Sequence, residues 1–269
     1  MIIKAFKNIF KHPIVLLPDL FLTGFVYLMA QLTWFLTGLT EVFPTMGEVS
    51  EEVIRTFFKE NAVQIIWPVL LFLLTTFVFG VAEKVIKLEL ISSIVQKDKP
   101  SFLKAWKNRI EYFYRVILLK MYIFLIFFLV FLIIFGVIGF LFYLLINPFT
   151  TSAMWISTII TIIFLLLAIV VLKMNFIYIY PILFMTKTRN PYRIIVESFK
   201  KFKLNKLFTF KVWLVLFLIG ALFGFLSFIL SLLQFIVITI IVVLIGVIQQ
   251  VWADRYIFMK FKEKFLRSH

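Results

Sequence analysis

The sequence predicts an all-α protein of the membrane: a polytopic helix bundle whose six transmembrane helices form three hairpins, each preceded by a basic amphipathic interfacial helix. Three observations lead to this fold class. Hydrophobic residues make up 63% of the 269 residues and charged ones only 15%, whereas soluble domains are roughly 45 to 50% apolar. Long stretches contain no charged residue, and the basic residues gather between them. No soluble core has room for so much apolar surface, so we expect lipid to be the solvent.

Four charge-free stretches are long enough to cross a bilayer, which takes about 20 residues for roughly 30 Å of hydrocarbon. Leu20 to Thr40 and Asn61 to Ala82 each predict one span. Met121 to Leu172 and Val212 to Ala253 hold 52 and 42 residues. A straight helix of the shorter one would run about 63 Å, so each of these two stretches predicts a hairpin of two spans.

Polar residues mark the turns inside the two long stretches. Asn147 and Pro148 mark the first turn, and Ser231 to Gln234 mark the second. The first apolar run, Ile14 to Thr37, is too long for the core of a signal peptide and lacks a small-residue cleavage site. We therefore expect it to remain as a span.

The basic residues predict the orientation. Of the 28 lysines and arginines, 25 fall in four segments that six spans would place on one side of the membrane, namely residues 1–13, 84–120, 187–211 and 255–267. Because basic loops stay in the cytoplasm, both termini of this multi-pass protein are predicted to be cytoplasmic in the cell membrane. Attraction between this belt and anionic lipid heads explains the net charge of +15, so we expect no nucleic acid partner.

The cytoplasmic segments resemble one another. Residues 4–8 read Lys-Ala-Phe-Lys-Asn, residues 104–108 Lys-Ala-Trp-Lys-Asn and residues 197–201 Glu-Ser-Phe-Lys-Lys. Each segment precedes an odd-numbered span and sorts apolar and basic residues onto opposite faces of a helix. These segments predict three amphipathic interfacial helices.

The ends of the even-numbered spans also match. Residues 81–86 read Val-Ala-Glu-Lys-Val-Ile and residues 252–257 Trp-Ala-Asp-Arg-Tyr-Ile, with residues 173–176 as the middle copy. The chain therefore predicts one membrane domain, residues 1–269, built from three parallel repeats of about 1–96, 97–186 and 187–269.

This order of six spans, with a short Ala/Ser-aromatic-Lys amphipathic helix before spans three and five, resembles a broad prokaryotic membrane family. That family includes the membrane domain of glycerophosphodiester phosphodiesterases and many uncharacterised six-span proteins. The resemblance covers most of the chain and is carried by residues 104–108 and 197–201. It implies a six-span fold and supplies no catalytic residues. The sequence holds no attached phosphodiesterase domain, so we do not expect that activity.

Polar residues near one end of the spans predict a ring at a common depth. The candidates for this inner ring are Asp19, Glu83, Lys84, Lys173, Asn175, Gln249, Gln250, Asp254 and Arg255. Asp19 is the only acid in the first span. Because acids inside a membrane usually pair with a base, we expect it to face Lys84 or Arg255.

The other unusual member of this ring is Lys173, which is surrounded by apolar residues in span four. We expect it to avoid lipid and to pair with Gln249 or Gln250 inside the bundle. Two interpretations of the ring stay open. It lines an inner vestibule, with Asp19 as a proton- or cation-coupling site, or it holds the spans together by ion pairs at the interface, where long basic side chains reach the headgroups. The structural interpretation is favoured because Asp19 lies near the headgroup level.

The basic side chains of the amphipathic segments are candidate contacts for anionic lipid in the cytoplasmic leaflet or for a partner protein. They are Lys4, Lys7, Lys104, Lys107, Arg109, Lys200, Lys201 and Lys203.

Residues suited to catalysis are scarce. The chain has no cysteine, only His12 and His269 as histidines, and no G-x-x-x-x-G-K motif. Thiolate chemistry, a metal cluster, a histidine-based triad and a phosphate loop are therefore not expected, and neither is an enzyme or a cofactor. The first hypothesis is a non-catalytic membrane subunit or scaffold whose basic cytoplasmic belt binds anionic lipid or a partner in a larger complex. The alternative is a transporter or channel for lipid-like or small amphiphilic molecules.

Overall fold

The computed structural model describes residues 2–37, 59–145, 151–186, 188–232 and 236–266, and all regular elements in these ranges are helical. In chain order they are α1 (Ile2–Lys11), the 3-10 turn η1 (Pro13–Val15), α2 (Leu17–Leu36), α5 (Ala62–Gln96), α6 (Phe102–Leu145), α7 (Thr151–Phe176), α8 (Ile179–Met185), α9 (Pro191–Leu204), α10 (Lys206–Ser231), α11 (Ile236–Phe261) and the π-type turn η2 (Lys262–Leu266). Among the described residues, six helical segments are long and apolar enough to cross a membrane. The all-α class and the six candidate spans are thus confirmed.

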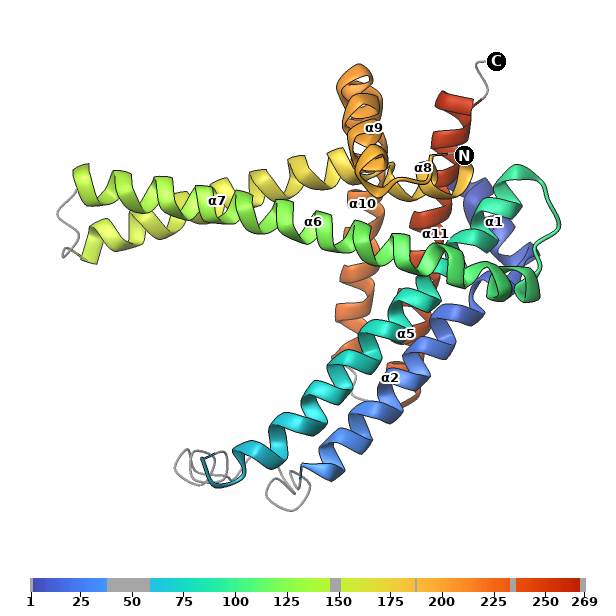
Figure 1. Ribbon diagram of the computed structural model, residues 1–269, viewed down its shortest axis with the longest axis horizontal. Coiled ribbons are helices and arrows are strands. Elements are labelled where there is room, and N and C mark those ends of the chain that lie inside the picture. The colour runs from blue at the N-terminus through green and yellow to red at the C-terminus, as the bar shows by residue number, and fades with distance from the viewer. Residues whose placement is uncertain (1, 38–58, 146–150, 187, 233–235, 267–269) are drawn as a thin grey trace.

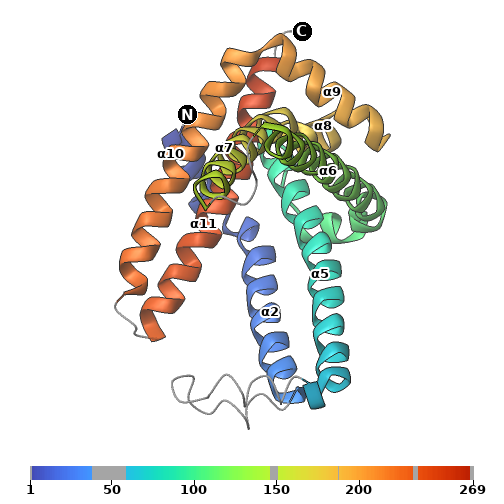
Figure 2. The same ribbon diagram turned by 90° about the vertical axis from the view of Figure 1, so that its left-hand side faces the viewer.

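The six long helices form three hairpins that spread apart from one end of the molecule (Figure 1). α2 packs against α5, α6 against α7, and α10 against α11. In Figure 1 the α6–α7 hairpin extends to the left while the other two point downward, and Figure 2 shows those two as separate arms. Both long charge-free stretches therefore fold back on themselves, as their lengths predict.

The helix ends agree with the predicted turns. α6 ends at Leu145 and α7 begins at Thr151; Asn147 and Pro148, predicted to form this turn, lie outside the described residues. α10 ends at Ser231, the first residue of the second predicted turn, and α11 begins at Ile236. Residues 233–235 between them also lie outside the described part.

Two of the amphipathic segments are separate helices. α1 ends at Lys11 because Pro13 has no backbone N–H and disfavours helical backbone at the residue before it. α9 begins at Pro191 after its N-cap, Asn190, whose Oδ1 accepts hydrogen bonds from two backbone N–H groups of the first turn at 3.0 and 3.3 Å. Each of these helices therefore has a local cause for its boundary.

The segment that begins at Phe102 is not a separate interfacial helix. It is the start of α6, which continues unbroken for 44 residues. No glycine or proline occurs from residue 102 to residue 135, so nothing in this stretch ends a helix. α5 is also longer than predicted and runs 35 residues, about 52 Å. Its end at Gln96 is closed by Lys97 in the left-handed conformation (φ 72°).

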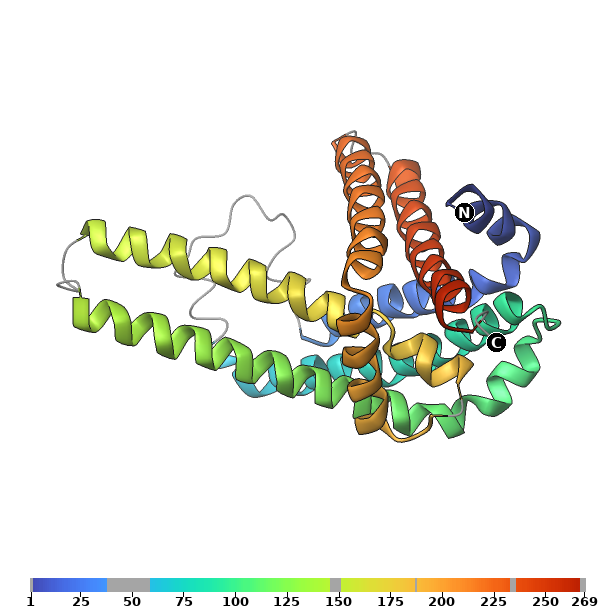
Figure 3. The same ribbon diagram turned by 90° about the horizontal axis from the view of Figure 1, so that it is seen from above.

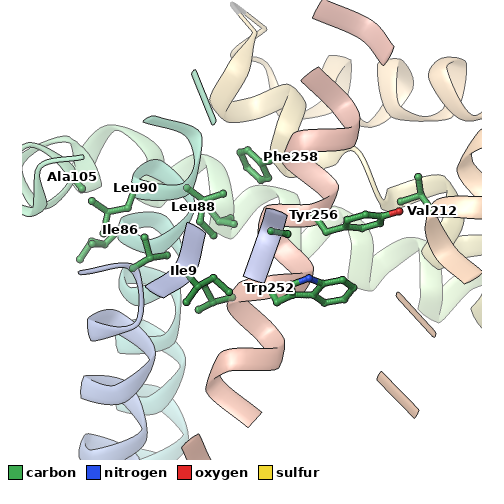
Figure 4. Packing of buried hydrophobic residues seen from close by; sticks show 13 residues of the cluster. Ile9, Ile86, Leu88, Leu90, Ala105, Val212, Trp252, Tyr256 and Phe258 are labelled. Atoms are coloured by element: carbon green, nitrogen blue, oxygen red, sulfur yellow. The ribbon is translucent and has the colours of Figure 1, made fainter. Parts of the chain in front are cut away.

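The hairpins meet α1, α8 and α9 in a hub, which consists of two clusters of buried apolar side chains. The first cluster comprises Ala5, Ile9, Val15, Ile86, Leu88, Leu90, Ile91, Ala105, Val212, Val251, Trp252, Tyr256 and Phe258. The second comprises Val81, Val85, Val116, Leu119, Tyr178, Ile179, Ile182, Leu183, Ile194, Ile195 and Phe261. Figure 4 shows the first cluster, in which Ile9 of α1, Ile86 of α5 and Trp252 of α11 lie close together. Contacts at the hub therefore connect all three hairpins.

Beyond the hub the hairpins are exposed along most of their length. Only 6 to 22% of the residues in the most apolar window of each span are buried. Figure 3, seen from above, shows the α6–α7 and α10–α11 hairpins pointing in different directions. Because helices that are apolar all round need an apolar environment, lipid is the solvent that fits these arms.

Candidate functional site

A completely buried lysine lies on α5 near the hub. The Lys87 side chain has 0% of its surface exposed, and its Nζ lies 2.7 Å from Oδ1 of Asp19, 3.1 Å from Oε1 of Glu83 and 3.6 Å from Oδ2 of Asp254. Lys87 donates a hydrogen bond to Asp19. We name Lys87, Asp19, Glu83 and Asp254 the Lys87 cluster. Its ion pairs connect α2, α5 and α11.

Local sequence explains how these side chains meet. Asp19 lies in the first turn of α2, where the helix dipole favours an acid. Glu83 precedes Lys87 by four residues on α5, the spacing that places two side chains on one helix face. The side chains of Asp19 and Glu83 are 6% and 8% exposed, whereas that of Asp254 is 20% exposed. Asp254 is therefore the best-hydrated acid of the cluster.

All three acids were predicted for the inner ring, but the predicted partner of Asp19 was wrong. Lys84 is half-buried, with its Nζ 4.2 Å from the centre of the Tyr180 ring. Arg255 is buried, makes no ion pair in the described part of the chain, and its Nε has no hydrogen-bond partner there. The reason is helical geometry: Lys84 directly follows Glu83 and so points about 100° away from it.

Lys87 was not predicted as a member of the inner ring and was counted only among the basic residues of segment 84–120. A signal was present. Lys87 stands four residues after Glu83, and apolar Ile86 and Leu88 flank it. A lysine between apolar residues and one helical turn from an acid is a candidate for a buried pair.

The remaining ring candidates do not join the Lys87 cluster. Lys173 is exposed near the end of α7, and no hydrogen bond joins it to Gln249 or Gln250, all three being described residues, so the predicted pairing is wrong. α7 ends three residues later, so the long side chain of Lys173 is close enough to the helix end to reach the interface. Asn175 is buried and donates back to its own helix at 2.8 Å. Gln249 lies half-buried against Gly220 of α10, and Gln250 is exposed.

The charges of the Lys87 cluster do not balance. One ammonium group faces three carboxylates, which gives a formal charge of two negatives when all are ionised. Within the described residues, Oδ2 of Asp19 and Oε1 of Glu83 are buried and have no hydrogen-bond donor; the 3.1 Å approach of Oε1 to Lys87 is an ion pair without hydrogen-bond geometry. Because buried charges are costly unless they are paired, Lys87 compensates the three carboxylates only in part.

A cavity of about 1230 Å³ lies between α2, α5 and the start of α6 and shares Glu83 with the Lys87 cluster. Its lining is Leu17, Pro18, Leu20, Phe21 and Leu22 of α2; Val78, Phe79, Ala82, Glu83 and Ile86 of α5; and Phe102, Trp106, Ile110, Phe113 and Tyr114 of α6. Glu83 is the only charged residue in this lining. The cavity is larger than most ligand pockets, which measure roughly 300 to 1,000 Å³.

The cavity also explains most of the predicted apolar face of the second amphipathic segment. On a helix with 100° between successive residues, Phe102, Trp106, Ile110 and Phe113 share one arc, and all four line the cavity. Leu103, predicted on the same arc, is 80% exposed and lies outside it. Most of the apolar face of this segment therefore lines the cavity.

The candidate basic contacts divide into two groups. The exposed ones are Lys7, Lys104, Lys107, Lys200 and Lys203. Lys201 is engaged within the protein, because its Nζ lies 3.3 Å from Oε1 of Glu197 and 4.6 Å from the centre of the Phe265 ring. The side chains of Lys4 and Arg109 lie outside the described residues.

No family model, curated protein or solved structure matches this chain. Among the described residues, no group of three or more His, Cys, Asp and Glu residues is arranged to hold a metal ion. The fold and the site define a helical protein with six membrane-compatible segments and an apolar cavity that has a carboxylate in its wall.

Proposed function

We propose that this protein is a non-catalytic integral membrane protein that binds a lipid-like amphiphile in the cavity between α2, α5 and α6. The observation that supports the proposal is the lining of the cavity, in which every residue except Glu83 is aliphatic or aromatic. A hydrocarbon chain from the bilayer can occupy such a cavity without removing water from polar groups, while a polar head contacts the carboxylate. A transporter of amphiphiles would share this binding step.

The position of the cavity favours entry from the cytoplasmic leaflet. Trp106 and Ile110 line the cavity and are 47% and 77% exposed, so its α6 wall is open to the surroundings. Lys104 and Lys107 are exposed on the same part of α6. Because lysines and tryptophans are favoured at the level of the headgroups, this part of α6 suits the inner membrane surface.

In the proposed topology both termini lie in the cytoplasm. The chain consists of three repeats, each made of a basic amphipathic segment, a span, a turn and a second span. Support comes from the repeated motif, whose small residue is buried in each copy: Ala5, Ala105 and Ser198 are all at most 1% exposed. Further support is that Glu83 and Asp254, which match in the repeated span ends, both lie next to Lys87.

This topology has a direct test, because the chain has no cysteine. A single cysteine introduced at Lys104 or at Lys200 is expected to react with a membrane-impermeant reagent from the cytoplasmic side in both variants. Labelling of the two positions from opposite sides would contradict the orientation and the repeat together.

Filling the cavity tests the proposed function. Gentle extraction and mass spectrometry are expected to find an amphiphile retained by the unmodified protein. Ala82→Trp places a large ring in the cavity wall and is expected to remove that amphiphile. Leu74→Trp on the same helix is the control, because Leu74 is 62% exposed and outside the cavity lining. Equal retention by both variants, or an unmodified protein with nothing retained, would refute the proposal.

A second candidate function is a scaffold that recruits a partner protein or anionic lipid heads by its basic belt. The specific observation in its favour is the exposure of Lys7, Lys107 and Lys200 on three different helices, since each base near an anionic membrane surface contributes about 1 kcal/mol. Replacing these three lysines with glutamine is expected to lower binding to vesicles that contain phosphatidylserine. Ala82→Trp is expected to leave that binding unchanged, so the two functions can be separated.

A further inference from the structure

Glu83 belongs to two features of the protein at once. It lines the cavity, and it is one of three carboxylates that surround the single ammonium group of Lys87. Its residue is 8% exposed, and its buried Oε1 has no hydrogen-bond donor in the described part of the chain. Glu83 therefore connects the wall of the cavity to a cluster in which carboxylates outnumber ammonium groups by three to one.

The lining also defines how an amphiphile would lie. Along α5 the lining runs from Ile86 through Glu83 to Val78, about 12 Å of helix. Glu83 lies near the hub, whereas Val78 and Leu22 lie farther along the arm, toward the middle of the spans. A chain directed toward Val78 and Leu22 remains among apolar groups, and the head at its other end reaches Glu83.

We infer that the amphiphile carries a cationic head, such as an amine or a quaternary ammonium group, which binds next to the Glu83 carboxylate while its chain fills the cavity. This inference rests on the proposed function and specifies its ligand class. A cationic head offsets part of the excess negative charge of the Lys87 cluster. An anionic head would add like charge beside buried carboxylates, which costs several kcal/mol, and the exposed bases Lys104 and Lys107 of α6 are not part of the lining.

Trp106 supplies the readout, because it lines the cavity. The full-length protein is reconstituted in phosphatidylcholine vesicles and titrated with three probes that share a bromine-bearing dodecyl chain and differ in the head: trimethylammonium, sulfate or maltoside. Bromine on a bound chain quenches the fluorescence of Trp106, and a Trp106→Phe variant measures the contribution of the other tryptophans. The concentration of each probe is expressed per bilayer lipid, so that the three probes are compared at equal concentrations within the membrane.

The expected result is half-maximal quenching by the trimethylammonium probe at a concentration at least about tenfold lower than by the other two, equivalent to about 1.4 kcal/mol. Glu83→Gln is expected to reduce this preference to less than about twofold and to leave quenching by the maltoside probe unchanged. Glu89→Gln is the matched control on α5, because Glu89 accepts a hydrogen bond from Asn108 and does not line the cavity; the preference is expected to persist.

A second variant keeps the inference testable if Glu83→Gln does not fold. Asp19→Asn lowers the negative charge of the Lys87 cluster without changing the lining and is expected to weaken the preference as well. Equal quenching by all three probes would overturn the inference and leave the proposed function intact, as would a preference for sulfate. Absence of quenching by every probe would refute both.

Discussion

The Lys87 cluster is expected to be the most sensitive electrostatic feature of this fold. Lys87→Met keeps a chain of similar size and removes the only cation among Asp19, Glu83 and Asp254. Removing one partner of a buried ion pair costs about 3 to 5 kcal/mol, because the remaining charge stays buried without a counter-charge. For a protein of this size each kcal/mol lowers the melting temperature by roughly 2 to 4 °C, which predicts a decrease of roughly 6 to 20 °C.

The assay is thermal unfolding in one detergent, followed by tryptophan fluorescence. Lys84→Met is the matched control: Lys84 is three residues away on the same helix and stacks on Tyr180, an interaction expected to contribute about 0.5 to 2 kcal/mol. The triple variant Lys87→Met, Asp19→Asn and Glu83→Gln is expected to recover much of the loss, because it removes the two most buried carboxylates and leaves only the more exposed Asp254. If Lys87→Met is no less stable than Lys84→Met, or the triple variant no more stable than Lys87→Met alone, the reasoning is refuted.

Two further predictions concern buried hydrogen bonds in the hub and use the same unfolding assay. Ser198→Ala is expected to lower stability by about 1 to 3 kcal/mol, because Ser198 donates to the carbonyl of Asn175 near the end of α7 at 2.5 Å; an unchanged melting temperature would contradict this role. Thr209→Val is expected to be more destabilising than Tyr178→Phe, although it removes fewer atoms. Thr209 donates to the carbonyl of Asn205 and lies 3.1 Å from the buried Tyr178 hydroxyl. Its loss removes the partner of that hydroxyl, whereas Tyr178→Phe leaves the Thr209 hydroxyl bonded to Asn205; the reverse order would refute this account.

Much of the helix layout could be predicted from residue order. The run from Met121 to Leu172 exceeds one bilayer crossing, so a reversal of direction was required, and the helices end at Leu145 and restart at Thr151. The boundary of α1 was likewise predictable, because Pro13 acts on its own neighbours. The extension of α5 beyond Ala82 was not predictable from hydropathy. An apolar run shows which residues can lie in lipid, whereas the backbone hydrogen bonds of a helix can continue past its end.

The candidate site was predictable in part for the same reason. Asp19, Glu83 and Asp254 stand out as acids beside apolar runs, and the structure brings all three to one point. Lys87 and Lys173 were misjudged in opposite directions: the base in a polar segment is buried, and the base in an apolar segment is exposed. Which face of a helix meets protein depends on the neighbouring helices, and the sequence does not state their positions.

Hydrophobicity, charge and helix-breaking residues affect the structure within one helical turn or one span. The sequence by itself therefore determined the helical class, the apolar surroundings that the helices need, the number of candidate spans and their approximate ends. The tertiary structure alone decided that charged side chains of α2, α5 and α11 meet at Lys87, that the hairpins spread apart, and that α2, α5 and α6 line a cavity with Glu83 in its wall. The physical reason is that a contact between residues 19, 87 and 254 depends on how three helices pack, which is a property of the whole chain.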